Sequence, residues 1–165
     1  MTLALVAYSS KRGSTKGIAE WIGADLREAG FDVDVRSAPS VRDVTPYHVV
    51  ILGGALYAGR WHRGARRFAR RHARMLRGRP VWLFSSGPLD VSADEQDIPP
   101  VKGAARAAEA LDARGHVTFG GRLAQDARGF PASAMAKTRA GDFRNPDRVH
   151  AWTAEVVDEL RAASH

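Results

Sequence analysis

Residues 3 to 17 read LALVAYSSKRGSTKG, an apolar run that stops at two serines, a basic pair, a glycine and two further hydroxyl side chains. A continuous apolar run of this length is typical of a strand buried on both faces of a parallel sheet. The next residues have apolar side chains at helical spacing, namely Ile18, Trp21, Ile22 and Leu26. Gly30 then offers a C-terminal stop. The first unit is therefore predicted to be strand, polar loop and helix.

The rest of the chain alternates in the same way. Residues 31–38 alternate apolar and charged side chains, as expected for a half-exposed edge strand. Three more apolar runs predict strands at 48–54, 79–86 and 116–121. Helical patterns cover 61–77, 101–114 and a C-terminal stretch that Asn145 or Asp147 could cap.

Five strands alternating with helices predict one α/β domain over residues 1–165, a doubly wound parallel sheet with helices on both faces. Ligands of such sheets bind at the carboxyl ends of the strands. The loops after the first, third and fourth predicted strands are therefore the candidate site.

Composition narrows the chemistry. The 165 residues contain no cysteine, which excludes disulfides, a thiolate nucleophile and cysteine-held metal clusters, so redox chemistry would require a bound cofactor. The histidines show no metal-ligand spacing, and no metal site is predicted. No apolar stretch is long enough to span a bilayer and no signal peptide is evident, so we expect a cytoplasmic protein.

The first loop has the chemistry of an anion site. Residues 9–15 hold four hydroxyl side chains, and Gly13 permits close approach of a ligand to the backbone just before a helix N-terminus. The alternative is that Ser14 simply caps the helix. Neither the G-x-G-x-x-G nor the G-x-x-x-x-G-K-[ST] fingerprint is present. A mononucleotide phosphomonoester is therefore favoured over a dinucleotide or nucleoside triphosphate.

The two later loops could hold a flat ring. GGALYAGRWH, residues 53–62, combines glycines with Tyr57 and Trp61, whose faces can stack on an aromatic system. The alternative for Trp61 is core packing, because it lies in phase with Phe68 on the predicted helix. SSGPLD, residues 85–90, supplies small residues that could border a ring edge.

Together these loops resemble the flavodoxin family, in particular its small branch that includes the menaquinone-dependent protoporphyrinogen IX dehydrogenases. The matching stretches are AYSSKRGSTKGIAEWI, VVILGGALYAGRWHRGARRF and VWLFSSGPL, with a looser match in GDFRNPDRVHAWTAEVVDEL. The resemblance implies a flavodoxin-like sheet of strand order 2-1-3-4-5 and an FMN cofactor. The sequence does not distinguish FMN from a deazaflavin.

The resemblance also implies roles for individual residues. The FMN phosphate would lie against Ser9, Ser10, Gly13, Ser14 and Thr15, with Lys11 and Arg12 adding charge beside it or pointing to solvent. The isoalloxazine ring would face Ala55, Leu56 and Tyr57 on one side and Ser86, Gly87 and Leu89 on its other border. No residue is assigned an acid-base role.

Charge distinguishes this chain from typical electron-carrier flavodoxins, which are acidic. The net charge is +7, yet residues 60–79 hold nine arginines and no acid, leaving 16 basic against 18 acidic residues elsewhere. The segment is either a solvated helix face or a docking face for an anion, including peripheral contact with an anionic membrane through Arg60 to Arg79. Its aromatic residues fall on the apolar side, which argues against nucleic acid.

Two classes of function follow. The first is an FMN-binding oxidoreductase, a flavin-dependent enzyme passing electrons between an organic or quinone-type substrate and an acceptor, either a redox partner or a small molecule. The second is non-catalytic: an electron-carrier flavodoxin, or an apo scaffold whose arginine-rich helix binds an anionic partner. The sequence names neither donor nor acceptor, does not decide whether porphyrinogen is a substrate, and leaves the redox potential and oligomeric state open.

Overall fold

The computed structural model describes residues 2–10, 13–87, 92–123 and 141–163. Of the predicted site residues, Lys11, Arg12 and Leu89 lie outside these ranges. The described elements are, in chain order, β1 (Leu3–Ser9), α1 (Ser14–Glu28), β2 (Asp32–Ser37), the 3-10 turn η1 (Ala38–Ser40), β3 (Val49–Tyr57), β4 (Arg60–Trp61), α2 (Arg63–Leu76), β5 (Val81–Ser86), α3 (Ser92–Glu95), α4 (Lys102–Leu111), β6 (Gly115–Phe119), β7 (Arg122–Leu123), β8 (Gly141–Asp142) and α6 (Pro146–Ala163).

The main sheet has the predicted topology. Its five parallel strands run in the order β2-β1-β3-β5-β6, with the short β4 added antiparallel to β3. The predicted fourth and fifth strands are β5 and β6, so the expected order 2-1-3-4-5 is confirmed. The strand at 31–38, expected at an edge, is β2 at one edge of the sheet.

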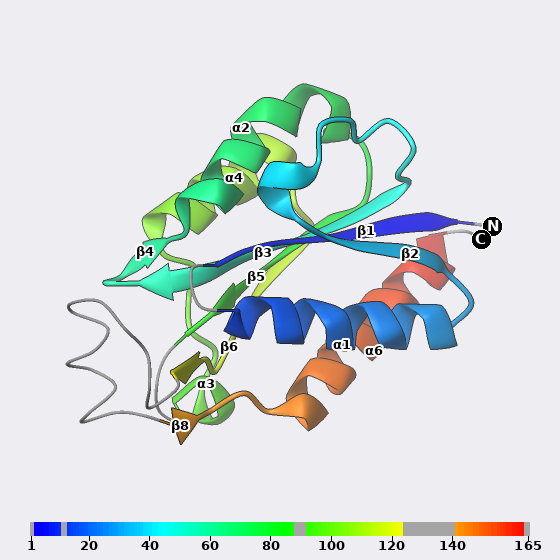
Figure 1. Ribbon diagram of the computed structural model, residues 1–165. Helices are drawn as coiled ribbons and strands as arrows, with labels where there is room; N and C mark the ends of the chain where they lie inside the picture. Colours follow the sequence, from blue (N-terminus) through cyan, green and yellow to red (C-terminus); the bar gives the residue numbers. More distant parts are fainter. Residues whose placement is uncertain (1, 11–12, 88–91, 124–140, 164–165) are drawn as a thin grey trace.

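Helices cover both faces of this sheet. In Figure 1, α1 and α6 pack on one face, whereas α2 and α4 pack on the other. Each face has its own buried cluster: one is centred on Ile18, Ile51 and Phe84, and the other on Leu52, Phe68 and Leu83. Strands β1, β3 and β5 are apolar on both faces because both faces are buried.

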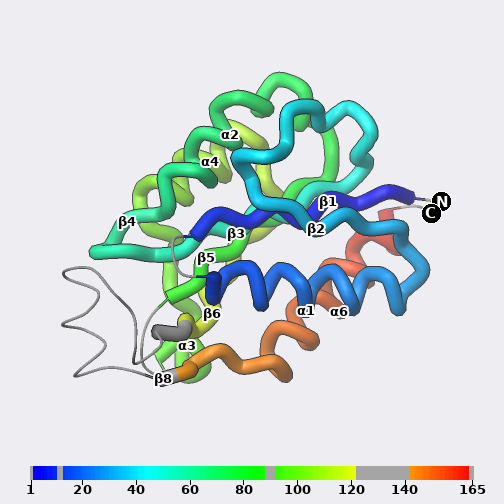
Figure 2. Tube along the Cα trace, viewed as in Figure 1, coloured from blue at the N-terminus to red at the C-terminus, as the bar shows by residue number. Residues whose placement is uncertain are grey.

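The helix ends follow the predicted signals. Gly30, just beyond α1, has a φ of 101°, a left-handed conformation that glycine adopts at little cost. At α6 the Asn145 side chain accepts the backbone N–H of Arg148 at 3.2 Å, so Asn145 rather than Asp147 caps this helix. In Figure 2, α6 ends beside the beginning of β1, at the edge opposite the carboxyl ends of the strands.

One predicted helix boundary is wrong. Residues 61–77 were expected to be helical, but Trp61 belongs to β4, and α2 begins at Arg63. The reason is that β3 continues to Tyr57 and folds back through Ala58 and Gly59, whose φ values of 51° and 74° suit a tight hairpin turn. The small antiparallel pair β7 and β8 was also not predicted.

No helix among the described residues is long and apolar enough to cross a membrane.

Candidate functional site

The carboxyl ends of three parallel strands meet at one edge of the sheet. Ser9 at the end of β1 lies opposite Gly54 of β3, and Gly54 lies opposite Ser85 of β5. The loops after β1, β3 and β5 therefore leave the sheet side by side, as the sequence predicted.

The first loop ends in a helix N-terminus with an unusual polar interior. Gly13 precedes α1 with a left-handed φ of 83°, and its N–H donates to the hydroxyl of Ser10 at 3.1 Å. Thr15 is fully buried, and its hydroxyl has no hydrogen-bond partner among the described residues. No acidic residue lies in the first turn of α1. A buried, unpaired hydroxyl beside free helix N–H groups fits a bound phosphate ester.

Ser14 is not the helix cap that the alternative interpretation required. The cap position belongs to Gly13, and within the described ranges no side chain caps the first-turn N–H groups. The Ser14 hydroxyl instead lies 3.4 Å from the hydroxyl of Ser86 at the end of β5. Ser14 and Ser86 are both buried, so this contact joins the first and third loops.

The second loop is a hairpin that contacts the third. Ala55, Leu56 and Tyr57 are half-buried at the end of β3, where Leu56 pairs with Trp61 and Tyr57 with Arg60. A Cβ atom on Gly87 would lie only 2.8 Å from the Cβ of Leu56, so the two loops touch where Gly87 has no side chain.

Trp61 takes the core position that was the alternative to ring stacking. It is 1% exposed and lies against Gly54, where an added Cβ would be 2.5 Å from its indole nitrogen. Its faces are thus unavailable to a ligand. Among the aromatic residues of this loop, Tyr57 is left for stacking.

Sequence reasoning missed His62, which ties the first loop to α2. Its Nδ1 atom accepts the backbone N–H of Gly64 at 3.2 Å and lies 2.5 Å from the Ser9 hydroxyl. Since Nδ1 acts as an acceptor, the Ser9 hydroxyl is the donor to it. A histidine at a helix N-cap is uncommon, and no sequence pattern pointed to this pairing.

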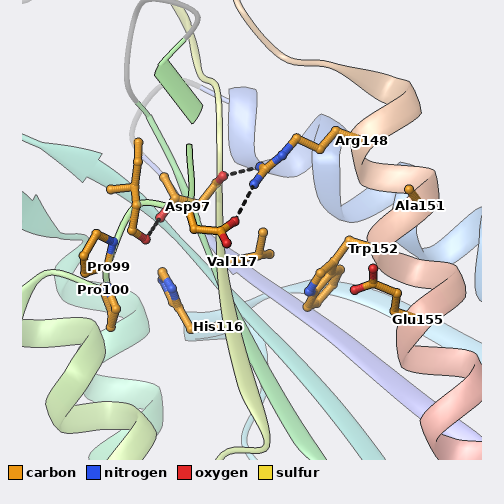
Figure 3. Close-up of a pocket in the computed structure, with 11 residues that line it drawn as sticks. Asp97, Pro99, Pro100, His116, Val117, Arg148, Ala151, Trp152 and Glu155 are labelled. Carbon is orange, nitrogen blue, oxygen red and sulfur yellow. Dashed lines mark hydrogen bonds and ion pairs between the residues drawn. The ribbon is translucent and has the colours of Figure 1, made fainter. Parts of the chain in front are cut away.

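A separate cavity of about 590 Å³ lies at the outer edge of β6 (Figure 3). It is lined from β6, α6 and residues 97–100, and it includes no predicted site residue. Arg148 points across it, donating to the Thr118 carbonyl and forming an ion pair with Asp97 at 3.8 Å. Burial lowers the pKa of His116 to about 4, and its Nε2 lies 2.8 Å from the Ser85 hydroxyl.

The described residues contain no group of three or more histidine, aspartate or glutamate side chains placed to hold a metal ion.

Comparison with solved structures defines the class. An oxidised flavodoxin from Bacillus cereus superposes with a TM-score of 0.64 at 18% identity, covering 96% of this chain and 99% of its own. A flavodoxin from Streptococcus pneumoniae TIGR4 gives a TM-score of 0.65 at 19% identity, covering 98% and 99%. At these identities the likeness shows the fold, which is flavodoxin-like.

The chain belongs to the flavodoxin domain family, whose model matches residues 5–138. Membership implies a flavin cofactor and a role in electron transfer. A distant curated relative, the protoporphyrinogen IX dehydrogenase [quinone] of Escherichia coli K12, is 26% identical over 83 residues. That alignment covers 49% of this chain and 46% of the relative, so the chain spans about half the length of the curated relatives it matches.

Proposed function

We propose that this protein binds FMN at the carboxyl ends of β1, β3 and β5 and passes electrons between an organic or quinone-type substrate and an acceptor. The observation that carries the proposal is Thr15, whose fully buried hydroxyl has no partner among the described residues at the N-terminus of α1. A buried hydroxyl without a partner is costly. A phosphate oxygen at this place would satisfy it.

Within the described residues, neutral donors would hold the phosphate end of the cofactor. Ser10 and Thr15 supply hydroxyls, the start of α1 supplies N–H groups, and Gly13 leaves room because no atom of the described residues beyond its chain neighbours lies within 4 Å of an added Cβ. Ser9 and Ser14 line the same loop from buried positions. Lys11 and Arg12, outside the described residues, would add positive charge.

The ring would lie between the second and third loops. Ala55, Leu56 and Tyr57 are half-buried, so they can cover one face and exclude water while Tyr57 stacks. Ser86 and Gly87 border the other side, with Leu89 beyond the described part of that loop. When bound, FMN supplies the redox chemistry. The protein residues bind it, orient it and shield it from solvent.

Titration of the purified protein with FMN and with riboflavin, followed by visible absorbance, tests the proposal. We expect FMN to bind at micromolar concentration and more tightly than riboflavin, because riboflavin lacks the phosphate. An absence of FMN binding at that concentration would refute the cofactor assignment and favour an apo scaffold.

A second candidate function is that of a one-electron carrier. The nearly full-length likeness to flavodoxins from Bacillus cereus and Streptococcus pneumoniae supports it. The distant relative, a protoporphyrinogen IX dehydrogenase [quinone], instead supports an enzyme that uses a quinone-type substrate. Stopped-flow mixing of the reduced holoprotein with a soluble quinone distinguishes them. Rapid two-electron exchange supports the enzyme, whereas stepwise single-electron transfer supports the carrier.

A further inference from the structure

Helix α2 and its flanks present a row of exposed arginines that the proposed function does not use. This arginine ridge consists of Arg60, Arg63, Arg67, Arg70, Arg71, Arg74 and Arg77. At 100° per residue, its members from 63 to 77 fall within about 120° of the helix circumference and therefore share one face. The whole segment 60–79 contains no acidic residue. Among the described residues, no ion pair joins a ridge arginine to a carboxylate.

The ridge is held in place by the opposite face of the helix. Phe68 and Leu76 are buried with Ala65, Ala69 and His72 in the core cluster on this side of the sheet. The helix therefore cannot rotate to offer an apolar face to a partner. In Figure 1, α2 lies beside α4 in the helical layer on this face of the sheet. What α2 offers is a row of guanidinium groups about 20 Å long, at 1.5 Å per residue, carried on a helix whose orientation the core fixes.

Two other arginines of the segment do not belong to the ridge. Arg79 donates to the carbonyls of Val44, Thr45 and Tyr47, which fixes its side chain. Arg66 is half-buried, and its stem packs against Gly103 of α4. The remaining seven arginines have no assigned structural role.

The side chains exposed on and beside the arginine ridge distinguish between the possible anionic partners. A single-stranded nucleic acid would need exposed aromatic rings among the basic residues, but Trp61 and Phe68 are 1% and 3% exposed. A specific protein interface usually buries its anchors, aromatic rings and arginines alike, in well-packed pockets that exclude water. The ridge offers only the 47% exposed Met75, and the described cavity lies elsewhere, at the β6 edge.

A fluid lipid surface needs no such pocket, because its headgroups move laterally to meet fixed charges. Clusters of four to eight basic residues on one helix are typical of binding to anionic lipids. We propose that the arginine ridge docks this protein on a membrane surface of anionic phospholipid, with α2 parallel to the surface and Met75 at the level of the headgroups.

The charge distribution orients the docked protein. Outside residues 60–79, acidic residues outnumber lysines and arginines by 18 to 16, so the electrostatic attraction acts through one face. Arg60 pairs with Tyr57 across the β3–β4 hairpin, so the ridge begins at the rim of the candidate site. Docking would place that rim near the lipid surface. The proposal itself concerns charge alone and stands whether or not the site holds FMN.

The test is co-sedimentation of the purified chain with vesicles. We expect binding to vesicles of phosphatidylglycerol and phosphatidylcholine in equal parts, none to phosphatidylcholine alone, and release near 1 M salt, where the Debye length is about 3 Å. Each arginine near an anionic surface changes partition about fivefold. The double variant Arg70→Gln, Arg74→Gln should therefore partition about 25-fold more weakly.

Two control variants separate charge from folding. Arg70→Lys with Arg74→Lys keeps both charges and should bind like the original chain. Arg161→Gln removes an exposed arginine from α6, on the opposite face of the sheet, and should also leave binding unchanged. Circular dichroism of each variant checks that it is folded.

Several results would overturn the proposal. One is binding to neutral vesicles that equals binding to anionic vesicles. Another is binding of the glutamine double variant to anionic vesicles that equals that of the original chain. A third is a loss of binding in the Arg161→Gln control as large as that in the double variant. Binding to poly-L-glutamate or duplex DNA at salt concentrations that abolish vesicle binding would instead assign the ridge to an acidic protein or a nucleic acid.

Discussion

The hydroxyl of Ser14, in the first turn of α1, lies 3.4 Å from the hydroxyl of Ser86 at the end of β5, across 72 residues of sequence. Both residues are buried, at 7% and 3% exposure. This contact joins the loop proposed to hold a phosphate to the loop proposed to border a ring. The two loops are thus held against each other by their own side chains.

A double-mutant cycle tests this contact. In flavin-free protein, Ser14→Ala and Ser86→Ala should each lower the free energy of unfolding by about 1 kcal/mol, with a coupling of about 0.5 kcal/mol or more. Urea denaturation measures all four proteins. The pairing of Ser86→Ala with Ser40→Ala, an exposed serine bonded to Ser37, should be additive. Additivity at Ser14 and Ser86 would show that their hydroxyls do not interact.

The substitution Thr15→Val should distinguish binding of the FMN phosphate from binding of the flavin ring. The substitution keeps the side-chain volume but removes the buried hydroxyl, so FMN affinity should fall by roughly 10-fold or more while riboflavin affinity stays unchanged. The flavin-free protein should be no less stable, because an unpaired buried hydroxyl is lost. Fluorescence titration with both flavins measures the effect, and Thr15→Ser is the control that keeps the hydroxyl. An equal loss for FMN and riboflavin would contradict the phosphate assignment.

Gly54→Ala should disrupt the packing of the β3–β4 hairpin. The new Cβ would lie 2.5 to 2.9 Å from three atoms of the buried Trp61 indole, which has no room to move, so we expect a loss of about 1–3 kcal/mol. Thermal and urea denaturation measure it. Gly103→Ala in α4 is the matched control: the atoms nearest its Cβ would be in the flexible Arg66 side chain, at 3.0 Å, and Trp61 Cβ, at 3.4 Å. Alanine also favours a helix, so this control should be neutral or stabilising.

Arg79→Met should destabilise the segment that precedes β3. Arg79 donates to the carbonyls of Val44, Thr45 and Tyr47 at 2.9, 3.2 and 2.6 Å, and a charged donor that is lost leaves these acceptors unpaired. We expect a cost of about 2 kcal/mol. Arg77→Met, two residues away and exposed, should change stability little. Equal effects of the two substitutions would show that the three carbonyls do not depend on Arg79.

Acid should destabilise the protein through His116. Its pKa is about 4 in the folded chain against 6.5 when exposed, so only the unfolded chain takes up the proton between these values. The free energy of unfolding should therefore fall as pH drops from about 6.5 to about 4, by at most about 1.4 kcal/mol per pH unit. Outside this pH range, His116 should contribute little to the pH dependence of the free energy of unfolding.

The variant His116→Gln should flatten this pH dependence, since a glutamine amide can still bond to the Ser85 hydroxyl but does not titrate. Urea midpoints across the window measure the difference. His72 contributes with the same sign, because burial lowers its pKa too, so part of the acid sensitivity should remain. An unchanged slope in the variant would contradict the assignment to His116.

Periodicity was sufficient to predict much of the fold. The apolar runs of β1, β3 and β5 and the alternation in β2 each reflect how many faces of the strand are buried. Local signals also placed Gly30 at a helix end and narrowed the cap of the last helix to Asn145 or Asp147, of which the structure selects Asn145. Periodicity failed at Trp61, because a buried aromatic residue shows the same spacing relative to Phe68 whether it precedes a helix in a hairpin or lies within that helix.

The candidate site, too, could be predicted from the sequence only in part. The hydroxyl loop, the Ala55 to Tyr57 end of β3 and the Ser86–Gly87 end of β5 were all evident as sequence motifs. Their meeting was expected because parallel strands bring their carboxyl ends to one edge. The contacts of Ser9 with His62 and of Leu56 with Gly87 were not evident. Each joins residues from different elements whose side chains meet only after the sheet has formed.

The sequence by itself determined that residues 60–79 carry nine arginines and no acid, since charge is a property of composition. Only the tertiary structure decided what those arginines do. It turns Arg79 inward onto three carbonyls, packs Arg66 beside α4 and leaves seven others exposed along α2 and its flanks. The physical reason is that a side chain's partners depend on what packs against its helix, and those neighbours come from distant parts of the chain.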